Sequence, residues 1–338
     1  MREEKNYSLL AHNTFAIPAK CRRFVEAASV DEVIAFAKSY DANIDDLLIL
    51  GGGSNVLFTN DYSGTVFHSA IKGIDVVDDV SASVLLRVGS GEVWDDVVEY
   101  CVGNSLYGAE NLSAIPGEVG ASAVQNIGAY GAEVKDIIYK MEAVDISTGK
   151  VVEIMAHDCR YAYRDSRFKN DWKNKYIITN VTYKLSKQFE PRLDYGNIRD
   201  ELQKRNIANP TAAQLRQVIT DIRNSKLPDP KVEGNAGSFF MNPIVGRSKF
   251  DALKAQYPTM PYYDVDTDNV KIPAGWLIDQ CGWKGKTIGN AGVHSKQALV
   301  LINRGGAAGT EIVNLCKMIV QDVKSKYGVE LVPEVNIV

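Results

Sequence analysis

Hydrophobic and polar positions follow two spacings along the chain, one typical of strands and the other typical of helices. The apolar run at 47–50 and the segments at 84–88 and 176–185 are predicted to be strands. Apolar residues at helical spacing predict a helix over 211–224, and a longer helix is expected over 310–327. Helices and strands therefore alternate without an internal repeat, which predicts a mixed fold of helices and sheets.

The N-terminal region is predicted to be a small α/β unit. Ser29 and Glu32 match a capping box, and Val33, Ile34 and Ala37 then fall on one helical face. The other predicted elements are a strand beginning at 66–67, a helix at 92–101, a hairpin over 140–155 that turns at 148–149, helices at 248–256 and 274–281, a strand at 298–302 and a C-terminal strand over 329–338.

The length of the chain predicts more than one domain, because 338 residues exceed what one hydrophobic core usually supports. Leu227–Pro230 holds two prolines directly after the predicted helix at 211–224, and it is the best candidate boundary. We therefore expect four segments, at 1–71, 72–227, 228–328 and 329–338.

Charge and composition exclude several classes of partner. Hydrophobic residues make up 45% of the chain and charged residues 24%, which is ordinary for a soluble globular protein. The net charge of −4 and the pI near 5.7 argue against general binding to nucleic acid or to anionic membranes. No apolar run approaches the ~18 residues of a membrane span, and the first six residues lack the apolar core of a signal peptide. We expect a cytoplasmic protein in which local groups bind any phosphate.

Cysteine and histidine are sparse. The five cysteines, at 21, 101, 159, 281 and 316, include no C-x-x-C pair and are expected to be reduced thiols in apolar surroundings. The four histidines, at 12, 68, 157 and 294, do not pair at metal-ligand spacing, and His294 is expected to be structural. We expect no metal.

The segment Gly51–Asn55 is the first candidate binding loop. It follows the apolar run at 47–50, and three glycines let backbone N–H groups approach an oxygen-rich anion because no Cβ intervenes. Ser54 and Asn55 add side-chain donors. The pattern is neither G-x-G-x-x-G nor a P-loop, and a tight turn between strands is the alternative interpretation.

A second small-residue region, 108–131, is predicted to be a long functional loop outside the core, because it is rich in Gly, Ala and Asn. It contains Ile115–Ala121 and Gln125–Gly131. Together with Gly51–Asn55, this region predicts one large phosphorylated cofactor lying between two lobes.

Three further segments carry groups suited to chemistry. Tyr161–Ser166 contains a guanidinium that suits a carboxylate or a phosphate, although Arg164 could instead pair with Asp165 to fix a loop. Gly234–Pro243 presents one serine among small residues, either as a turn cap or as a proton donor. No histidine lies nearby in the sequence to make Ser238 a nucleophile. Glu334 is either exposed on an edge strand or partly buried with a raised pKa.

Taken together, these segments resemble the UDP-N-acetylenolpyruvoylglucosamine reductase family, the flavin enzymes that make UDP-N-acetylmuramic acid in bacterial wall synthesis. The resemblance covers nearly the whole chain in the family's order, at 51–55, 111–131, 161–166, 234–243 and 333–334. Asp194–Gly196 and Tyr262–Tyr263 resemble the substrate-closing elements of the type I branch. Two departures are peripheral: Gly52 stands where many members carry Glu, and Met241 where Lys occurs.

The resemblance implies an α+β fold with a two-lobed FAD-binding domain of the vanillyl-alcohol-oxidase type and a smaller α+β substrate-binding domain. On that basis 1–71 and 72–227 are the two lobes, 228–328 covers the substrate, and 329–338 returns to the active site. The resemblance also implies NADPH as the co-substrate and usually a monomer. FAD is expected to bind non-covalently, since neither glycine loop contains the histidine by which flavin-oxidase relatives often attach it.

The resemblance also implies roles for individual residues. The catalytic residues are Arg164, Ser238 and Glu334. The FAD-binding residues are Gly51, Gly52, Gly53, Ser54, Asn55, Ile115, Pro116, Gly117, Gly120, Ala121, Gln125, Asn126, Gly128, Ala129 and Tyr130. The substrate-binding residues are Tyr163, Tyr195, Lys226, Asn242, Tyr263, Lys284 and Gln297.

The implied reaction adds hydride to the enolpyruvyl ether of UDP-N-acetylglucosamine enolpyruvate and pushes electrons toward its carboxylate. Arg164 and a protonated Glu334 would stabilise the developing charge, and Ser238 would protonate the adjacent carbon. Two alternatives stay open from the residues alone. One is a flavin-dependent sugar or alcohol oxidase of the same fold, and the other is a nucleotide-sugar or flavin-binding module without turnover.

Overall fold

The computed structural model describes every residue from 1 to 338, and its chain forms two compact units. Unit 1 comprises Met1–Tyr7, Cys21–Gly52 and Tyr62–Ser225, and unit 2 comprises Ser8–Lys20, Gly53–Asp61 and Lys226–Val338. The division after Ser225 lies directly beside the predicted boundary at 227–230. Two short N-terminal segments belong to unit 2, which the contiguous segment expected at 1–71 did not anticipate. The further division of 1–227 into two cofactor-binding lobes stays a prediction.

The first sheet of unit 1 is formed by four strands in the order β1-β2-β5-β3. Their bounds are Arg2–Ser8 for β1, Lys20–Ala27 for β2, Tyr62–Ser69 for β5 and Leu47–Leu50 for β3. Strands β2 and β3 both run parallel to β5, so their carboxyl ends meet at one edge of the sheet. The predicted strands at 47–50 and 66–67 are confirmed, and the second is longer than expected.

Helix α1 (Val30–Ser39) connects β2 to β3 and begins at the predicted cap. The backbone N–H of Glu32 donates to Ser29 Oγ at 3.3 Å, and the Glu32 carboxylate reaches back to the N–H of Ala28. Its buried residues include Phe36, whose ring lies 4.5 Å from that of Phe67 on β5. The capped amphipathic helix is therefore confirmed, and it covers the sheet through an aromatic contact.

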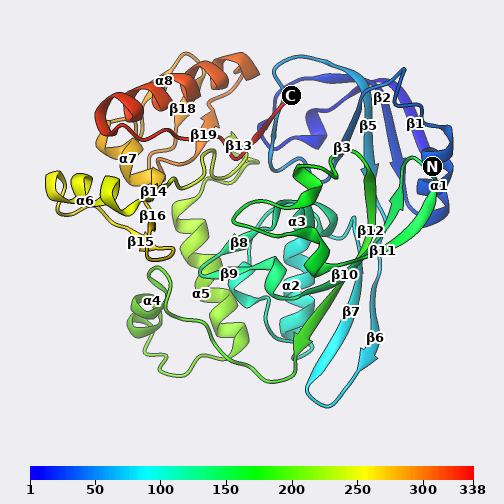
Figure 1. Ribbon diagram of the computed structural model, residues 1–338, viewed down its shortest axis with the longest axis horizontal. Coiled ribbons are helices and arrows are strands. Elements are labelled where there is room, and N and C mark those ends of the chain that lie inside the picture. Colours follow the sequence, from blue (N-terminus) through cyan, green and yellow to red (C-terminus); the bar gives the residue numbers. More distant parts are fainter. The chain divides into compact units, whose positions relative to one another are not determined.

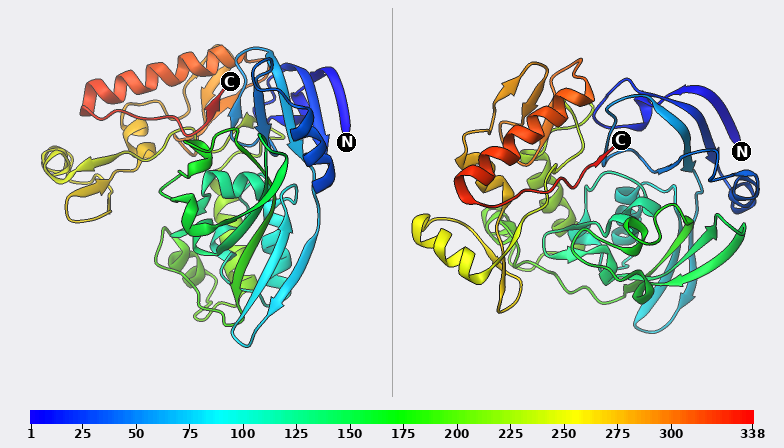
Figure 2. Two further views of the ribbon diagram at one scale, coloured as in Figure 1. Left: turned by 45° about the vertical axis from the view of Figure 1, so that its right-hand side comes forward. Right: turned by 45° about the horizontal axis from the view of Figure 1, so that its top comes forward.

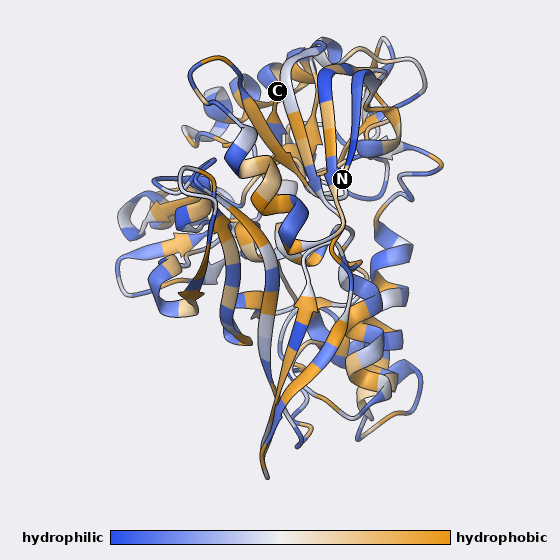
Figure 3. Cartoon of the chain, turned by 90° about the vertical axis from the view of Figure 1, so that its right-hand side faces the viewer, coloured by the Kyte–Doolittle hydropathy of each residue, from blue (hydrophilic) through white to orange (hydrophobic).

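The second sheet of unit 1 has five antiparallel strands in the order β11-β10-β12-β7-β6. Their bounds are Lys150–Met155, Ile138–Asp145, Tyr176–Ser186, Ser83–Gly89 and Ile74–Asp79, in that order. Buried positions alternate with partly exposed ones along β7, whereas β12 is buried at seven successive positions; Figure 3 colours the strands by hydropathy. The continuous burial of β12 shows that both of its faces are covered, and the predicted hairpin and both predicted strands are confirmed.

Helices α2 (Trp94–Gly103) and α3 (Val119–Gln125) lie on one side of the five-stranded sheet (Figure 1). The buried Trp94 packs edge-on against Tyr183 of β12, with ring centroids 5.7 Å apart. Its indole N–H donates to the carbonyl of Leu112 at 2.9 Å. The core therefore joins the sheet, both helices and the segment before α3.

The expectation that 108–131 is a loop outside the core was wrong. This region contains a 3-10 turn at Glu110–Leu112, helix α3 and the strand β8 (Gly128–Ala129), which pairs with β9 (Ala132–Glu133). A Cβ added to Gly120 would lie 3.0 Å from the Cβ of Ser90. Small residues are present here because the backbone packs closely against its neighbours, and not because the segment is exposed.

The last part of unit 1 is a small helical layer made by α4 (Ile198–Lys204) and α5 (Ala212–Lys226). Ile198 and Leu202 pack with the apolar face of α5, which confirms the helix predicted at 211–224. Arg216 anchors α5 through an ion pair of 2.7 Å to Asp95 on α2. Short 3-10 turns in this unit lie at Val134–Asp136, Ala156–Cys159 and Arg167–Lys169.

Unit 2 is built on a four-stranded sheet and a long helix. The sheet has the order β13-β19-β18-β17, with bounds Gly234–Asn235, Leu301–Asn303, Ala291–Val293 and Thr287–Ile288. Helix α8 (Gly309–Tyr327) lies along β18 and β19 and ends at Gly328, whose φ of 60° is left-handed (Figure 2). The predicted helix is confirmed, and the strand expected at 298–302 begins later than predicted.

Unit 2 also contains two short helices that the sequence predicted, and a small sheet and a 3-10 turn that it did not. Helices α6 (Arg247–Gln256) and α7 (Ala274–Gln280) match the two predicted ones. A three-stranded sheet contains β14 (Ile244–Gly246), β16 (Asn269–Lys271) and β15 (Tyr263–Asp264), and a 3-10 turn lies at Leu10–His12.

The C-terminal tail is extended, but it is not one strand over 329–338 as expected. Only β20 (Asn336–Ile337) is a strand, and it pairs in parallel with β4 (Val56–Leu57). Before that point the tail contacts another segment, because Met241 N–H donates to Val332 and Glu334 N–H donates to Phe239. The tail therefore divides its backbone hydrogen bonds between two neighbours.

All five cysteines are free thiols, and four of them are buried. None of the helices has the length and the apolar character needed to cross a membrane.

A stability prediction follows from the core beneath α1. Ile177 on β12 is fully buried, whereas Ile44 is 82% exposed. We expect Ile177→Ala to lower the free energy of unfolding by about 2–5 kcal/mol, because it leaves a cavity. The matched Ile44→Ala should change it by less than about 0.5 kcal/mol. Urea unfolding without added ligand measures both, and equal losses would contradict this core assignment.

Candidate active site

The two glycine-rich segments of unit 1 lie against each other. A Cβ added to Gly51 would lie 3.0 Å from the Cβ of Ala121 and 3.3 Å from Oε2 of Glu118. A Cβ on Gly52 would lie 3.5 Å from the Cα of Gly117. The first loop follows β3 directly and the second leads into α3. The structure therefore brings together two parts of the predicted cofactor site that stand about seventy positions apart in the sequence.

The chain passes from unit 1 to unit 2 within the first glycine loop, between Gly52 and Gly53. Gly53 has a φ of 66°, and its carbonyl accepts from the N–H of Thr14 at 3.1 Å. Asn55 donates its amide to the carbonyl of Glu334 at 3.3 Å, and its own carbonyl accepts from the N–H of Asn336. The second half of the loop is thus fastened to the C-terminal tail.

Backbone hydrogen bonds hold the second glycine segment against the start of α2 and against Ser90, the residue after β7. Gly117 has a φ of 117°, and its carbonyl accepts from the N–H of Trp94 at 3.0 Å. Gly120 N–H donates to the carbonyl of Ser90 at 2.9 Å. Because both contacts use the main chain, the segment is positioned independently of side-chain rotamers.

Asn126 ends α3 in a left-handed conformation, with a φ of 47°. Its buried side chain donates to the carbonyl of Ala162 at 2.8 Å and accepts from the N–H of Lys135. Asparagine tolerates this conformation better than most residues do. It fixes the end of the second glycine segment to the turn that carries Tyr163 and Arg164.

Arg164 lies on that turn in a left-handed conformation of its own, with a φ of 56°. Its guanidinium donates to the carbonyl of Gly128 at 2.7 Å and lies over the ring of Tyr163, 5.8 Å from the centroid. The carboxylate of Asp165 accepts from the amide of Asn170. The structure therefore joins Arg164 to Asn126 and Gly128 of the predicted cofactor set.

Tyr195 lies beside the same segment. A Cβ on Gly131 would lie 3.3 Å from the Cβ of Tyr195, and one on Gly196 would lie 3.7 Å from the ring of Tyr130. Burial raises the pKa of the Tyr130 phenol, so this group stays neutral and can donate a hydrogen bond near neutral pH. One predicted substrate residue, Tyr195, thus lies next to one predicted cofactor residue, Tyr130.

In unit 2 the structure places Ser238 beside Glu334. The N–H of Glu334 donates to the carbonyl of Phe239 at 2.8 Å, and Phe240 and Pro333 form a β-bridge. Phe239 and Phe240 are buried, while Ser238 and Glu334 are both partly exposed. Buried aromatic anchors thus hold two partly exposed polar side chains that stand 96 positions apart in the sequence. Arg164, the third predicted catalytic residue, belongs to unit 1.

Three of the five predicted substrate residues of unit 2 lie next to α7. The Asn242 amide oxygen accepts from the N–H of Ala274 at 2.9 Å, so Asn242 lies at the start of the helix. Gln297 lies there too, since a Cβ on Gly275 would be 3.1 Å from its amide oxygen. Lys284 instead pairs with Asp279 in the last turn, at 3.3 Å. The remaining two are Lys226, which is exposed at the end of α5, and Tyr263, which is on β15.

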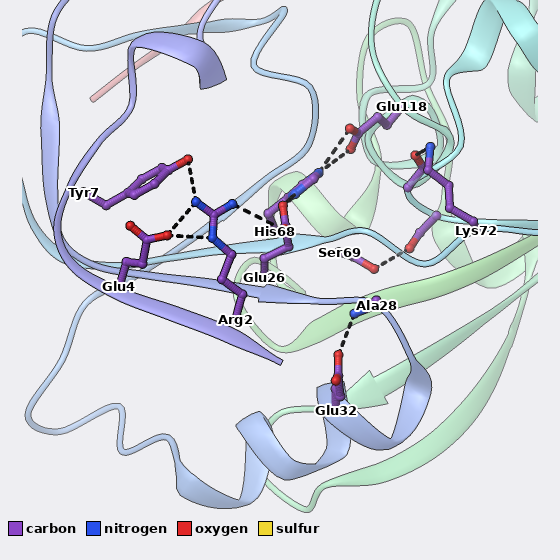
Figure 4. Close-up of polar contacts among 12 residues, drawn as sticks. Arg2, Glu4, Tyr7, Glu26, Ala28, Glu32, His68, Ser69, Lys72 and Glu118 are labelled. Atoms are coloured by element: carbon purple, nitrogen blue, oxygen red, sulfur yellow. Dashed lines mark hydrogen bonds and ion pairs between the residues drawn. The ribbon is translucent and has the colours of Figure 1, made fainter.

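Sequence reasoning missed His68 and Glu118. The imidazole of His68 lies between the carboxylates of Glu118 and Glu26 (Figure 4). His68 belongs to no motif, and Glu118 lies within Ile115–Ala121 but was given no role; only the pairing of parallel strands brings His68 beside the first glycine loop. Arg223 on α5 was also missed, although it donates to the carbonyl of Ala114 next to the second glycine segment.

The residues present fit a phosphate-bearing cofactor. Gly51 and Gly52 bring no Cβ of their own to the contact with the second loop, and Gly52 lies against the Cα of Gly117, so main-chain N–H groups can approach a bound anion. The side chains do not gather three His, Cys, Asp or Glu groups in a way that could hold a metal ion. The close contact of the two glycine segments favours an anionic cofactor at this place.

Comparisons with known proteins agree with this geometry. One family profile, described as the C-terminal domain of UDP-N-acetylenolpyruvoylglucosamine reductase, matches residues 229–338. A second, described as an FAD binding domain, matches residues 21–155. The second match covers both glycine segments and agrees with the predicted FAD-binding fold.

Curated relatives and a solved structure extend the match to the whole chain. A UDP-N-acetylenolpyruvoylglucosamine reductase of Bacteroides fragilis is 54% identical, over 99% of this chain and 100% of its own. One of Flavobacterium johnsoniae is 43% identical over all of both chains. The crystal structure of the enzyme from Thermus caldophilus has a TM-score of 0.69 at 20% identity, over 100% of this chain and 99% of its own, and so shares the fold. The chain belongs to the UDP-N-acetylenolpyruvoylglucosamine reductase family.

Proposed function

We propose that this chain reduces the enolpyruvyl ether of UDP-N-acetylglucosamine enolpyruvate to UDP-N-acetylmuramate, as a step of peptidoglycan synthesis. The proposal names it a UDP-N-acetylmuramate dehydrogenase that uses FAD and takes electrons from NADPH. The observation that carries it is the 54% identity over the full length of a relative with this activity in its name. The backbone hydrogen bond from Glu334 to Phe239, the residue after Ser238, adds a local reason, because the reaction needs a proton donor and a group that shares developing charge.

FAD is the cofactor that the two glycine segments would hold, and when bound it supplies the hydride that is added to the substrate. Main-chain N–H groups near Gly51, Gly52 and Gly117 would bind its diphosphate. Other residues of the predicted cofactor set would orient it through backbone contacts. Binding is non-covalent in this proposal, because neither glycine segment offers a histidine.

Arg164 would bind the carboxylate of the enolpyruvyl group. Its guanidinium is a permanent planar cation, and the hydrogen bond to Gly128 fixes where it lies. Charge that develops on the carboxylate then meets a donor that does not need to reorganise, which is the most effective form of electrostatic stabilisation. Glu334, in its protonated form, would donate a second hydrogen bond to the same charge.

Ser238 would donate the proton that completes the reduction. The carbon next to the carboxylate becomes strongly basic after hydride addition, so a neutral hydroxyl is acidic enough to protonate it. Gly237, with a φ of 66°, turns the chain so that Ser238 follows a tight bend. Buried Phe239 and Phe240 then hold the segment in place. A fixed donor of this kind is typically worth 10²–10⁴-fold in rate.

The UDP end would be held by residues that take no part in the chemistry. In this proposal Asn242 and Gln297 act at the start of α7, lysines 226 and 284 supply charge for the diphosphate, and Tyr163, Tyr195 and Tyr263 contact the sugar or the uracil. We further propose that the protein acts as a monomer in the cytoplasm, without nucleic-acid or membrane partners.

The first test is an anaerobic absorbance spectrum near 450 nm of the protein with bound FAD. We expect NADPH to bleach the band and UDP-N-acetylglucosamine enolpyruvate to restore it, because the substrate accepts the hydride. Bleaching without recovery would exclude the proposed substrate. Rapid O₂ consumption with a sugar or an alcohol, and no reaction with NADPH, would instead establish the oxidase alternative.

Replacement of the proton donor separates the two half-reactions. We expect Ser238→Ala to leave bleaching by NADPH unchanged and to slow recovery by about 10²–10⁴-fold, since only the second step needs the proton. Ser248→Ala, on the exposed side of α6 in the same unit, is the matched control and should behave like the parent. Stopped-flow absorbance measures both steps. Normal recovery in Ser238→Ala would remove this serine from the mechanism.

Arg164→Lys tests whether the guanidinium itself is required. Lysine keeps the charge but loses the planar fork, so we expect kcat to fall by about 10²–10³-fold. Arg160→Lys is the matched control, because Arg160 is exposed and has a similar left-handed φ of 47°. Steady-state kinetics with saturating NADPH provide the comparison. Equal rates for the two variants would show that Arg164 only supports the turn.

A further inference from the structure

A histidine between two carboxylates lies beneath the glycine segments of unit 1. His68 Nδ1 is 3.0 Å from Oε2 of Glu26, and its Nε2 is 3.1 Å from both carboxylate oxygens of Glu118 (Figure 4). A neutral imidazole has one N–H and can donate to only one of these partners, whereas the imidazolium donates to both. The geometry therefore suits the charged form of His68.

The strand pairing places this histidine at the edge where the first loop begins. His68 is the register partner of Glu26 on β2 and of Leu50 on β3, and all three strands run in parallel. Leu50 is followed directly by Gly51. Ligands of parallel sheets bind beyond the carboxyl ends of the strands, so His68 lies where a cofactor would approach.

Glu118 brings a negative charge to the same place. One of its carboxylate oxygens would be 3.3 Å from a Cβ on Gly51, and the other would be 3.8 Å from a Cβ on Gly52. A diphosphate bound by the N–H groups of this loop would be repelled by an unneutralised carboxylate so close to them. Because the proposed cofactor is itself an anion, the charge on Glu118 has to be compensated.

Residues next to His68 give the second segment another anchor. Ser69 Oγ lies 2.7 Å from Ser90 Oγ, and the carbonyl of Ser90 accepts from the N–H of Gly120. The end of β5 thus contacts the second segment at two points, Glu118 and, through Ser90, Gly120. A change in the charge of His68 would therefore act on a segment that is otherwise held by main-chain contacts.

The charges around the imidazole favour its protonation. Its side chain is 12% exposed, and those of Glu118 and Glu26 are 15% and 26% exposed. Burial opposes the charged form, but hydrogen bonds and charges from both carboxylates outweigh it, so the pKa of His68 lies above its usual value. The next charged group outward is Arg2 of β1, which is 3.7 Å from Glu26 and also pairs with Glu4.

We propose that protonated His68 is a positioning residue of the cofactor site, which holds Glu118 in place and cancels its charge beside Gly51 and Gly52. This inference rests on the proposed binding of FAD at these loops. It assigns the loops a proton-dependent affinity: FAD binds tightly while His68 is charged and more weakly once it is neutral.

The direction of the pH dependence follows from linkage. A bound diphosphate favours the imidazolium, so FAD binding raises the pKa of His68 further and takes up a proton. The affinity for FAD is therefore highest at pH values below the pKa of His68 in the cofactor-free protein, and it falls as the pH rises above that pKa. The slope is at most about ten-fold per pH unit, because a single proton is involved.

The test measures the FAD dissociation constant of the cofactor-free protein between pH 6 and pH 9, by quenching of flavin fluorescence. We expect His68→Gln to weaken binding about ten-fold at pH 6 and to remove the pH dependence. The Glu118→Gln variant should bind FAD as tightly at pH 9 as at pH 6, because the neutral amide at position 118 leaves no negative charge for His68 to cancel. The double variant should regain most of the affinity that His68→Gln loses.

The control is His157→Gln, which removes an exposed histidine of unit 1 and should retain the parent profile. Ring signals of His68 in NMR spectra, identified by their loss in His68→Gln, should titrate above the usual range and shift upward with FAD. If His68→Gln does not fold, Glu118→Gln alone decides the matter, because the proposal requires its binding to be independent of pH.

Two results would overturn the inference. One is FAD affinity in the parent that does not change over this pH range, and the other is a Glu118→Gln variant that weakens binding as His68→Gln does. Both leave the proposed function intact, since FAD still binds. Failure of the parent to bind FAD at any pH would instead overturn the proposed function itself.

Discussion

The close approach of two main-chain segments is the constraint on which the cofactor site depends. Gly51 and Gly52 pack against 117–121 with no side chain of their own between them. Any larger residue at Gly51 would meet Ala121 or Glu118. Because β3 and β5 are parallel, the same sheet edge supplies the first loop and the residues beneath it. Backbone geometry, more than any single side chain, thus creates a place for a phosphate-bearing cofactor.

The charge of Glu118 is the second constraint on this place. A partly buried carboxylate beside an anion-binding loop would normally be unfavourable, and in this protein a histidine bridges it to a second carboxylate. The acidic pI of the chain leaves no general positive field to compensate for Glu118. The ion pair with His68 therefore compensates the charge of Glu118, and in the proposal above the protonation of His68 affects the binding of the cofactor.

The C-terminal tail positions predicted site residues in unit 2, as the sheet edge positions them in unit 1. It hydrogen-bonds first to the segment at 239–241 and then to β4. The first contact places Glu334 beside Ser238, and the second carries the tail back to the segment that follows the glycine loop. Two polar groups with complementary chemistry are therefore fixed by backbone pairing over buried Phe239 and Phe240.

The sequence by itself determined the regular elements and the chemistry that the chain offers. Helix α1 with its Ser29 cap, the hairpin of β10 and β11, and helix α8 ending at Gly328 all depend on local spacing and caps, which a sequence displays directly. The resemblance of five motifs to one family also came from residues alone. Only the tertiary structure decided that 108–131 is packed and helical, that the tail changes partners and that His68 lies between Glu26 and Glu118. Those features depend on contacts between residues that stand up to about 280 positions apart, as in the pairing of Asn336 with Val56, and such contacts leave no periodic pattern in the chain.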